Sequence, residues 1–345
     1  MPPTRRGAHA RPRPARSRRG RTASAAAAAL VVVAVALRFA LAGSPVRALG
    51  ATGRSGRSVA TSAARRSASG ATNAAVTDAR PSRGIPLDPA LFTAGSCEAF
   101  APTAGDRHET VFIDAGHGGP DPGAIGRTSS GRVVEEAVET LPVALDTTAI
   151  LRSKGYRVVV SRTRQTAVAR PGPGDMTGQV FTVKGEIREI GARDVCANLA
   201  HASVLVAVYF DAGGSALDAG SVTGYDRARP FWRSSLRLAR LVQRDVVAGM
   251  NAKGWAIPDD GVVSDITLGG IPLSAGGAAY GHLIVLGPAK PGFFTTPSLM
   301  PGALIEPLFI TDPFEGTIAA RTTGQRVIAA GIAKGVEQYF AGGSA

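Results

Sequence analysis

The stretch VFIDAGHGGPDPGA, residues 111–124, carries the strongest structural signal in this chain. It begins as an apolar run, reaches Asp114, and then turns into a loop rich in Gly and Pro around His117. An apolar run that stops at glycines is typical of a buried strand that opens into a loop. We therefore expect a strand over 110–114 and, just past its carboxyl end, a loop that presents His117.

Strand-like and helix-like patterns alternate downstream of this stretch. Short apolar, β-branched runs indicate strands, and apolar residues at three- and four-residue spacing indicate helices. Their alternation predicts an α/β fold, a three-layer sandwich in which a mostly parallel, twisted sheet of about six strands carries helices on both faces. Strands are expected over 110–114, 157–162, 203–212, 282–286 and 303–309, and helices over 135–154, 185–202, 234–250 and 324–340.

The formal net charge of +13 is concentrated at the N-terminus. Residues 1–80 contain fifteen Arg, no Lys and a single acidic residue, Asp78, so they contribute +14 and the remaining residues sum to −1. A nearly neutral globular part argues against nucleic-acid binding. A basic N-terminal region is more typical of a topology signal or of contact with a polyanionic surface.

Residues 1–42 have the composition of a targeting segment. An Arg-rich start precedes the apolar run ASAAAAALVVVAVAL, and small residues follow at Ala40 and Ala42. This pattern predicts a secretory signal peptide, with a retained N-terminal membrane anchor as the alternative. Residues 43–106 are rich in Ala, Ser, Gly and Arg without a repeating pattern, which predicts a disordered linker. One folded domain is expected over 107–343.

Two cysteines, Cys97 and Cys196, lie beyond the expected cleavage site. In an exported protein an even number of cysteines favours a disulfide. Two separate, reduced side chains are the alternative reading.

Titratable residues gather where the predicted strands end. In α/β folds ligands bind beyond the carboxyl ends of the strands, and His and carboxylate side chains are the ligands that Zn²⁺ and related cations accept. The sequence therefore predicts a metal centre built from several separate segments. The candidates are His117, Glu135 or Glu136, Tyr209, Asp211 and Glu306.

Four segments, in this order, resemble the family 3 type of zinc-dependent N-acetylmuramoyl-L-alanine amidases, which cleave peptidoglycan. VFIDAGHGGPDPGAIG resembles the family's opening strand and first ligand loop, and the segment beginning EEAVETLPVAL resembles its ligand-bearing helix. RDVCANLAHASVLVAVYFDA resembles the helix and strand that follow, and PGALIEPLFITD resembles the segment that ends in a catalytic Glu. The resemblance covers residues 110–342, approximately.

The resemblance implies a role for each matching residue. His117 and Glu136 would be zinc ligands, and Glu306 would be the general base for a zinc-activated water. Glu136 is preferred over Glu135 because five residues separate it from Leu141, as in the family pattern.

The implied substrate is the amide between the lactyl group of N-acetylmuramic acid and L-alanine. Zinc polarises such a carbonyl and lowers the pKa of a water molecule from 15.7 toward about 7. Gly118 and Gly119, which lack side chains, would let a glycan strand approach His117 closely as substrate-binding positions.

One position departs from the family pattern. The family's third zinc ligand is a His, and Tyr209 occupies that place here. Tyr209 could ligate as a phenolate, Asp211 could replace it from the same face of the strand, or the site could bind no zinc. His282, next to an apolar run, is a more remote replacement.

The leading hypothesis is an exported, monomeric Zn²⁺ enzyme that acts on peptidoglycan or muropeptides, outside the cell or in the cell wall. The alternative is a catalytically inactive amidase-like module that binds peptidoglycan or a partner and regulates cell-wall metabolism. An unrelated binding or structural protein is a third, more distant hypothesis.

Overall fold

The structure is a computed structural model that describes residues 84–267 and 275–342. The targeting segment expected over 1–42 and the first part of the expected linker, residues 43–83, lie outside the described residues. Among the helices within the described ranges, none is both long enough and apolar enough to cross a membrane.

The fold is built on an eight-stranded sheet with the order β1-β2-β6-β3-β9-β12-β10-β11, two strands more than the sequence predicts. The four central strands run parallel, whereas β2 and β10 are antiparallel to their inner neighbours. The predicted mostly parallel sheet is therefore confirmed, with mixed edges. The strands are β1 (Ile85–Pro86), β2 (Ser96–Phe100), β3 (Thr110–Ala115), β6 (Arg157–Arg162), β9 (Val204–Val208), β10 (Ser221–Tyr225), β11 (Asp259–Ser264) and β12 (Gly302–Glu306).

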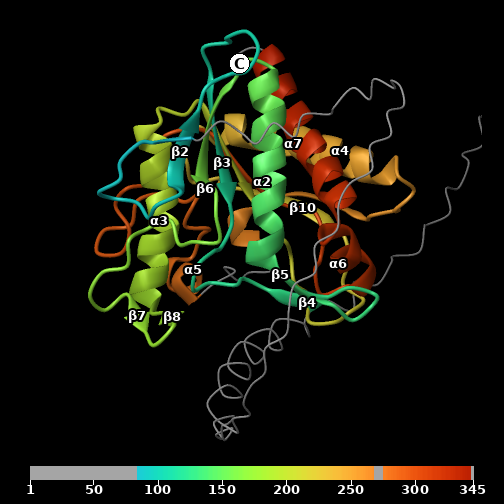
Figure 1. The fold of residues 1–345 in the computed structure, drawn as a ribbon, viewed down its shortest axis with the longest axis horizontal. Helices are drawn as coiled ribbons and strands as arrows, with labels where there is room; N and C mark the ends of the chain where they lie inside the picture. Colours follow the sequence, from blue (N-terminus) through green and yellow to red (C-terminus); the bar gives the residue numbers. More distant parts are fainter. Residues whose placement is uncertain (1–83, 268–274, 343–345) are drawn as a thin grey trace, which may run out of the picture. The chain divides into compact units, whose positions relative to one another are not determined.

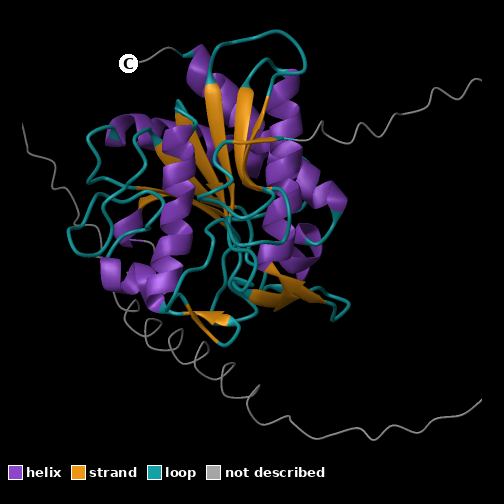
Figure 2. Cartoon of the chain, turned by 60° about the vertical axis from the view of Figure 1, so that its left-hand side comes forward, coloured by secondary structure: helices purple, strands orange, loops and turns teal. Residues whose placement is uncertain are grey.

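Helices cover both faces of this sheet, and Figure 2 shows them on either side of the strands. In β3, Val111 and Ile113 join the core shared with α2, α4 and α7, whereas Phe112 joins the core shared with α3. Strands buried on both faces read as near-continuous apolar runs, so the three-layer sandwich is confirmed. The main helices, labelled in Figure 1, are α2 (Glu136–Ser153), α3 (Val183–Leu199), α4 (Trp232–Asn251) and α7 (Thr322–Ala341).

Shorter elements lie beside these layers. Two two-stranded sheets accompany the main one, and one of them leads directly into α2. The short elements are β4 (Ile125–Arg127), β5 (Val133–Glu135), β7 (Met176–Thr177), β8 (Val180–Phe181), α5 (Ala275–Tyr280) and α6 (Pro313–Ala319).

The prediction of a disordered linker is wrong for residues 84–106. This segment contributes β1 and β2, and β2 pairs antiparallel with β6. A short strand such as β2, which has five residues and is buried almost throughout, gives little sequence signal, but Phe100 packs into the core at 5% exposure. The folded domain therefore begins about twenty residues earlier than expected.

The apolar run 282–286 does not form the predicted strand. Leu283, Val285 and Leu286 are buried, yet the backbone there forms turns. A short apolar run indicates burial but does not by itself distinguish a strand from a packed turn.

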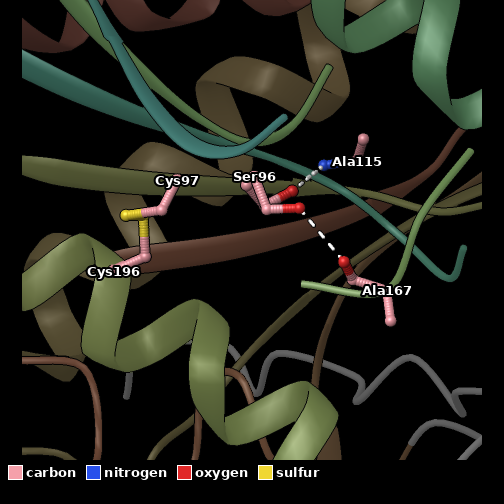
Figure 3. The surroundings of a disulfide bond; sticks show 6 residues. Ser96, Cys97, Ala115, Ala167 and Cys196 are labelled. Atoms are coloured by element: carbon pink, nitrogen blue, oxygen red, sulfur yellow. Dashed lines mark hydrogen bonds between the residues drawn. A yellow bond between two sulfur atoms is a disulfide. The ribbon is translucent and has the colours of Figure 1, made fainter. Parts of the chain in front are cut away.

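Cys97 of β2 and Cys196 of α3 are joined in a disulfide (Figure 3). Both side chains are fully buried, and the Cα atoms lie 5.7 Å apart. Next to Cys97, the Ser96 hydroxyl donates to the carbonyl of Ala167 at 3.1 Å. The disulfide and this hydrogen bond tie the added edge strand to the helix layer and to the segment that follows β6.

Candidate active site

Three of the predicted site residues lie at the same end of the sheet. β3, β9 and β12 are parallel neighbours. His117 follows β3, Tyr209 follows β9 and Glu306 is the last residue of β12. The parallel register brings the carboxyl ends of these strands together, as expected for a ligand site in an α/β fold.

The loop that carries His117 adopts an unusual backbone conformation. His117 has a φ of +58°, and Gly118 and Gly119 that follow have φ of +123° and +63°. A non-glycine residue rarely adopts a left-handed conformation, and such strain gathers at functional sites. Two backbone hydrogen bonds between Gly118 and Asp121 close the loop.

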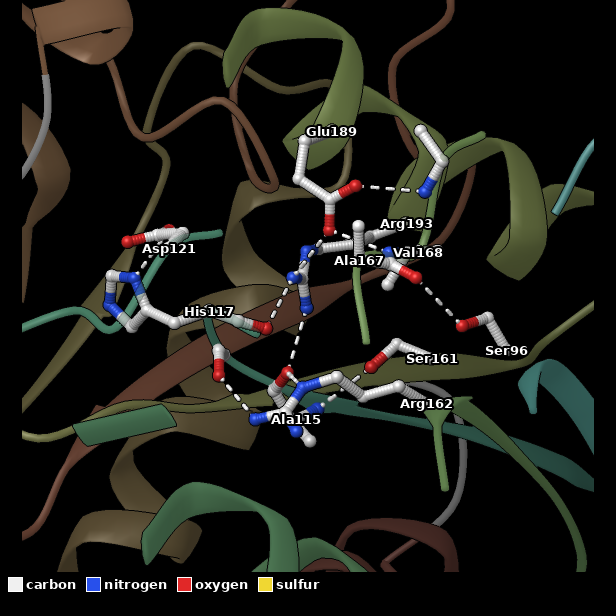
Figure 4. Close-up of polar contacts among 12 residues, drawn as sticks. Ser96, Ala115, His117, Asp121, Ser161, Arg162, Ala167, Val168, Glu189 and Arg193 are labelled. Atoms are coloured by element: carbon white, nitrogen blue, oxygen red, sulfur yellow. Dashed lines mark hydrogen bonds and ion pairs between the residues drawn. The ribbon is translucent and has the colours of Figure 1, made fainter. Parts of the chain in front are cut away.

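A buried arginine fixes this loop from α3. Arg193 donates to the carbonyl oxygens of Ala115 at 2.8 Å and of His117 at 2.9 Å (Figure 4). Its guanidinium also forms ion pairs with Asp114 and with Glu189. Since buried charges are tolerated when they are paired and hydrogen-bonded, Arg193 acts here as an anchor for the loop.

A second buried arginine supports the same turn from β6. Arg162 donates to the carbonyl oxygens of Ala115 (3.0 Å), Gly116 (2.8 Å) and Ala137 (2.8 Å). It thereby links the end of β3 to the first turn of α2, which carries Glu136. The relative position of His117 and Glu136 depends on this link.

The imidazole of His117 lies between two carboxylates. Its Nδ1 is 2.7 Å from Asp121 Oδ2, and its Nε2 is 3.0 Å from Glu136 Oε2. Burial lowers the pKa of His117, but the charges of Glu136 and Asp121 outweigh burial and raise it to about 10. Without a cation, His117 is therefore held as an imidazolium ion.

Glu136 is the first residue of α2 and is 3% exposed. Its Oε2 accepts a hydrogen bond from the Ala124 backbone amide at 2.9 Å, and its Oε1 accepts one from Phe210 at 2.8 Å. These two bonds aim the carboxylate at His117. Glu135, the alternative candidate, is exposed at the end of β5.

Tyr209 lies against the site as a buried aromatic ring, 7% exposed. Its ring packs edge-on to that of His117, with the centroids 5.0 Å apart and the planes at 68°. A Cβ on Gly116 would lie 2.8 Å from three carbons of the Tyr209 ring, so the glycine makes room for it. Burial and the negative charge of Asp114 raise the pKa of the phenol well above its ordinary value, although Arg193 opposes this.

Glu306 is fully buried, and its Oε1 has no hydrogen-bond partner. Burial, together with the charges of Asp211 and Glu136, raises its pKa well above the ordinary value, and His117 opposes the rise. Burial likewise raises the pKa of Asp211 to about 6. Asp211 also accepts a hydrogen bond from the Ala212 amide at 2.7 Å.

Gly118 and Gly119 are required by the packing of the loop. A Cβ on Gly118 would lie 2.6 Å from the Thr166 carbonyl oxygen, and one on Gly119 would lie 2.5 Å from the Ala167 nitrogen. The left-handed conformations and close contacts of Gly118 and Gly119 are enough to explain why both positions are glycine. The expectation that they also contact substrate stays a prediction. Gly123 is the glycine that faces the site, because a Cβ there would lie 2.6 Å from Glu136 Oε2.

His282 does not reach this site. It lies beside Asp226 and Asp265, which follow β10 and β11. Because β10 runs antiparallel to β12, these residues lie at the opposite end of the sheet. The hypothesis that His282 replaces the missing ligand is therefore wrong.

Two residues that contact or support the His117 loop, Asp121 and Arg162, were not identified from the sequence. Asp121 stands four residues after His117, close enough in sequence to have been a candidate partner for its Nδ1. Arg162 gives no comparable signal, because its contacts depend on the pairing of β6 with β3.

Comparisons with known proteins agree with this geometry. A sequence profile of the N-acetylmuramoyl-L-alanine amidases matches residues 111–338. The germination-specific N-acetylmuramoyl-L-alanine amidase of Bacillus subtilis is 23% identical over 233 residues, covering 67% of this chain and 79% of that protein. The N-acetylmuramoyl-L-alanine amidase AmiA of Salmonella typhimurium is 27% identical over 247 residues, covering 67% of this chain and 75% of that protein.

The fold comparison points the same way. The CwlD amidase from Clostridioides difficile, solved in complex with the GerS lipoprotein, superposes with a TM-score of 0.50 at 19% identity, covering 68% of this chain and 98% of that chain. This likeness concerns the fold alone. Because the family profile spans more than half of the sequence, including the strand and loop of His117 and the segment of Glu306, this chain belongs to the N-acetylmuramoyl-L-alanine amidase family.

Proposed function

We propose that this chain is an exported, zinc-dependent hydrolase that cleaves the amide between N-acetylmuramic acid and the L-alanine of the peptidoglycan stem peptide. The observation that carries the proposal is the pairing of His117 with Glu136 beside the unpartnered carboxylate of Glu306. Peptidoglycan and muropeptides are the proposed substrates, and no nucleic-acid partner is needed. A monomer suffices, because all three residues come from one chain.

The residues present fit a zinc ion. His117 Nε2 and Glu136 Oε2 lie 3.0 Å apart, close to the separation of two neighbouring zinc ligands at about 2.1 Å from the metal. Asp121 holds the other ring nitrogen, as the outer carboxylate does for many zinc-bound histidines. His117 and Glu136 would hold the ion, and Tyr209, whose ring packs edge-on to that of His117, is the candidate for a third ligand.

Zinc, when bound, supplies Lewis acidity that polarises the amide carbonyl and makes water a stronger acid. The role of Glu306 follows from its position. Its unpartnered oxygen accepts a proton from the attacking water and then delivers that proton to the departing nitrogen of L-alanine. A cation held by His117 and Glu136 would lower the raised pKa of Glu306, which would keep its carboxylate ionised for this task.

The remaining residues of the site position these groups. Asp121 fixes the His117 ring, and the amides of Ala124 and Phe210 fix Glu136. Arg193 holds the backbone of the His117 loop. Together they keep the ligands and the base in place before substrate binds, which lowers the reorganisation that the reaction requires.

The substitution Glu306→Gln tests this proposal. It preserves the shape of the side chain but removes its basicity, so release of stem peptide from muropeptides is expected to fall by at least about 100-fold, while the zinc content of the purified protein stays the same. The matched control is Glu139→Gln, which changes another buried glutamate, one that hydrogen-bonds Gln325 on α7. Full activity in Glu306→Gln contradicts the proposal.

A second function is favoured by one observation. The buried, neutral phenol of Tyr209 is a poor metal ligand compared with an imidazole, which suits an inactive module that binds peptidoglycan and regulates cell-wall metabolism. For that function, wild-type protein binds muropeptides without cleaving them, and Glu306→Gln binds them equally well.

A further inference from the structure

A second group of metal-ligand side chains lies at the end of the sheet opposite Glu306. Asp226 directly follows β10, Asp265 directly follows β11, and His282 lies two residues after α5. The two strands are parallel neighbours, so their carboxyl ends present both aspartates side by side. This end of the sheet plays no part in the proposed amide hydrolysis.

The distances within this group match a metal site. His282 Nδ1 lies 3.0 Å from Asp226 Oδ2 and 3.1 Å from Asp265 Oδ2, and the three atoms all lie within 4.8 Å of one another. Ligand atoms about 2.1 Å from one ion, at angles of about 90–109°, are separated by about 3.0–3.4 Å. In the described part of the chain, this is the group of three His, Cys, Asp or Glu side chains whose ligand atoms all lie within 4.8 Å of one another.

One buried oxygen of this group is left without a hydrogen bond. Asp226 is 1% exposed, and its Oδ2 has no hydrogen-bond partner although it lies 3.0 Å from His282 Nδ1. Nδ1 lies at a similar distance, 3.1 Å, from Asp265 Oδ2, and the single proton that it can carry cannot serve both carboxylates. A buried carboxylate oxygen without a partner is costly, and a cation bound at this point would satisfy it.

Backbone amides hold both aspartates in this arrangement. The amide of Ala228 donates to the Oδ1 of Asp226, and the amide of Ile266 donates to the Oδ1 of Asp265 at 2.9 Å. Each carboxylate therefore turns its Oδ2 toward the same point. The orientation does not depend on a bound ligand, so the group is preorganised.

The nearby Arg229 makes no direct ion pair with either aspartate within the described residues. Its guanidinium donates to the carbonyl oxygens of Gly287 and Ser298 and acts on Asp226 only through space. With a neutral imidazole, the two carboxylates carry a charge of −2, which a divalent cation would balance.

We propose that Asp226, Asp265 and His282 bind a divalent transition-metal ion, with Zn²⁺ as the best match. A nitrogen ligand disfavours Mg²⁺ and Ca²⁺, which prefer oxygen, whereas zinc readily takes one imidazole and two carboxylates. The His282 side chain is 24% exposed, so solvent has access and water completes the coordination. The ion joins the ends of β10 and β11 to the buried turn at 282–286 and acts as a structural tie.

The test separates this site from the proposed catalytic one. The double variant His117→Asn/Glu136→Gln removes the donors of the catalytic site, and Asn tolerates the left-handed backbone at position 117. Metal-free protein is titrated with ZnCl₂ against a chelating dye. One zinc ion per chain is expected to bind, and adding Asp226→Asn is expected to weaken its affinity by at least about tenfold.

Matched controls come from an exposed His–Asp pair. His108 Nδ1 lies 3.4 Å from Asp106, and both side chains are exposed. Asp106→Asn and His108→Gln are expected to leave zinc affinity unchanged, whereas Asp265→Asn and His282→Gln weaken it. If a variant fails to fold, anomalous diffraction from zinc-soaked crystals of the unaltered chain decides the matter by a peak between the three side chains.

Two results would overturn the proposal. One is a His117→Asn/Glu136→Gln chain that binds no zinc. The other is equal zinc affinity with and without Asp226→Asn. Either result assigns the three side chains to a hydrogen-bonded cluster that shares a proton, and neither bears on the proposed hydrolase activity.

Discussion

His117 Nε2 lies 3.0 Å from Glu136 Oε2, although the two residues come from a loop and from the first turn of the helix beyond it. The contact depends on two left-handed glycines, on the buried arginines Arg162 and Arg193, and on two backbone amides that aim Glu136. This preorganisation of one imidazole and one carboxylate supports the proposal that the two side chains are metal ligands.

Glu136→Gln is expected to reduce zinc affinity at this site by at least about tenfold and to abolish amide cleavage, because an amide oxygen carries no charge to offset that of the ion. Glu135→Gln is the matched control, since its side chain is the exposed neighbour. Zinc competition assays on both variants measure the difference. Equal losses in the two variants would mean that the helix start, not the Glu136 carboxylate, is what matters.

Asp121→Asn tests the carboxylate that orients His117. The variant keeps the shape of the loop but weakens the hydrogen bond to Nδ1, so we expect zinc affinity and kcat/KM to fall by about 10- to 100-fold. The pKa of His117 in the metal-free protein should fall as well, because the Asp121 charge helps to raise it. Asp106→Asn, beside the exposed His108, serves as the control. Unchanged zinc affinity and an unchanged His117 pKa, followed by NMR in EDTA, would argue against this positioning role.

The stability of the metal-free protein should depend on His117. Its pKa is about 10 in the folded protein and 6.5 in the unfolded chain. A raised pKa contributes stability that is fully present below pH 6.5 and is lost as the pH rises through about 10. In EDTA, the stability gap between wild type and His117→Asn should therefore shrink from about pH 6 to pH 10. Thermal unfolding at several pH values measures this gap, and a gap that widens with pH contradicts the charge assignment.

Tyr209→His places an imidazole at the position that we propose for the third zinc ligand. Zinc affinity and activity are both expected to rise, the affinity by at least about tenfold. Tyr209→Phe removes the hydroxyl but keeps the ring that packs against Gly116, so it separates the effect of the hydroxyl from the effect of ring packing. Zinc titration of the three proteins gives the answer: if Tyr209→His binds no more tightly than wild type, the ring does not occupy the ligand position.

Removal of the disulfide tests how firmly the N-terminal edge strand is held. The bridge joins residues 99 positions apart. A disulfide that closes so long a loop removes much conformational entropy from the unfolded chain and so contributes strongly to stability. Cys97→Ala with Cys196→Ala is expected to lower the free energy of unfolding by about 2–5 kcal/mol. Denaturant titration of the double variant and of the reduced wild type measures this cost. A change below about 0.5 kcal/mol would show that β2 is held by its pairing with β6 alone.

The central part of the fold was predictable because its strands are buried on both faces and so read as continuous apolar runs. The placement of His117 and Glu306 followed from the rule that strand ends gather ligands. β2 was missed, since one short strand next to an Ala/Ser/Gly-rich segment has no distinctive period. The apolar run at 282–286 was misread because apolarity reports burial and not backbone geometry.

The parts of the site that escaped prediction depend on distant contacts. Arg162 supports the turn at Gly116 only because β6 pairs with β3. Outside that site, the contact of His282 with Asp226 joins residues 56 positions apart, which no local pattern indicates. Spacing along the chain can predict which residues contact one another within one helix or loop. Contacts between residues on different strands or helices can be predicted only when the order of the strands in the sheet is known.

The most direct measurement is the mass of the products that the purified, zinc-supplemented protein forms from defined muropeptides. The account predicts intact N-acetylmuramic acid and a stem peptide with a free L-alanine amine, formed by wild type and not by Glu306→Gln. Cleavage within the glycan, cleavage between amino acids of the stem, or no cleavage under these conditions would contradict it.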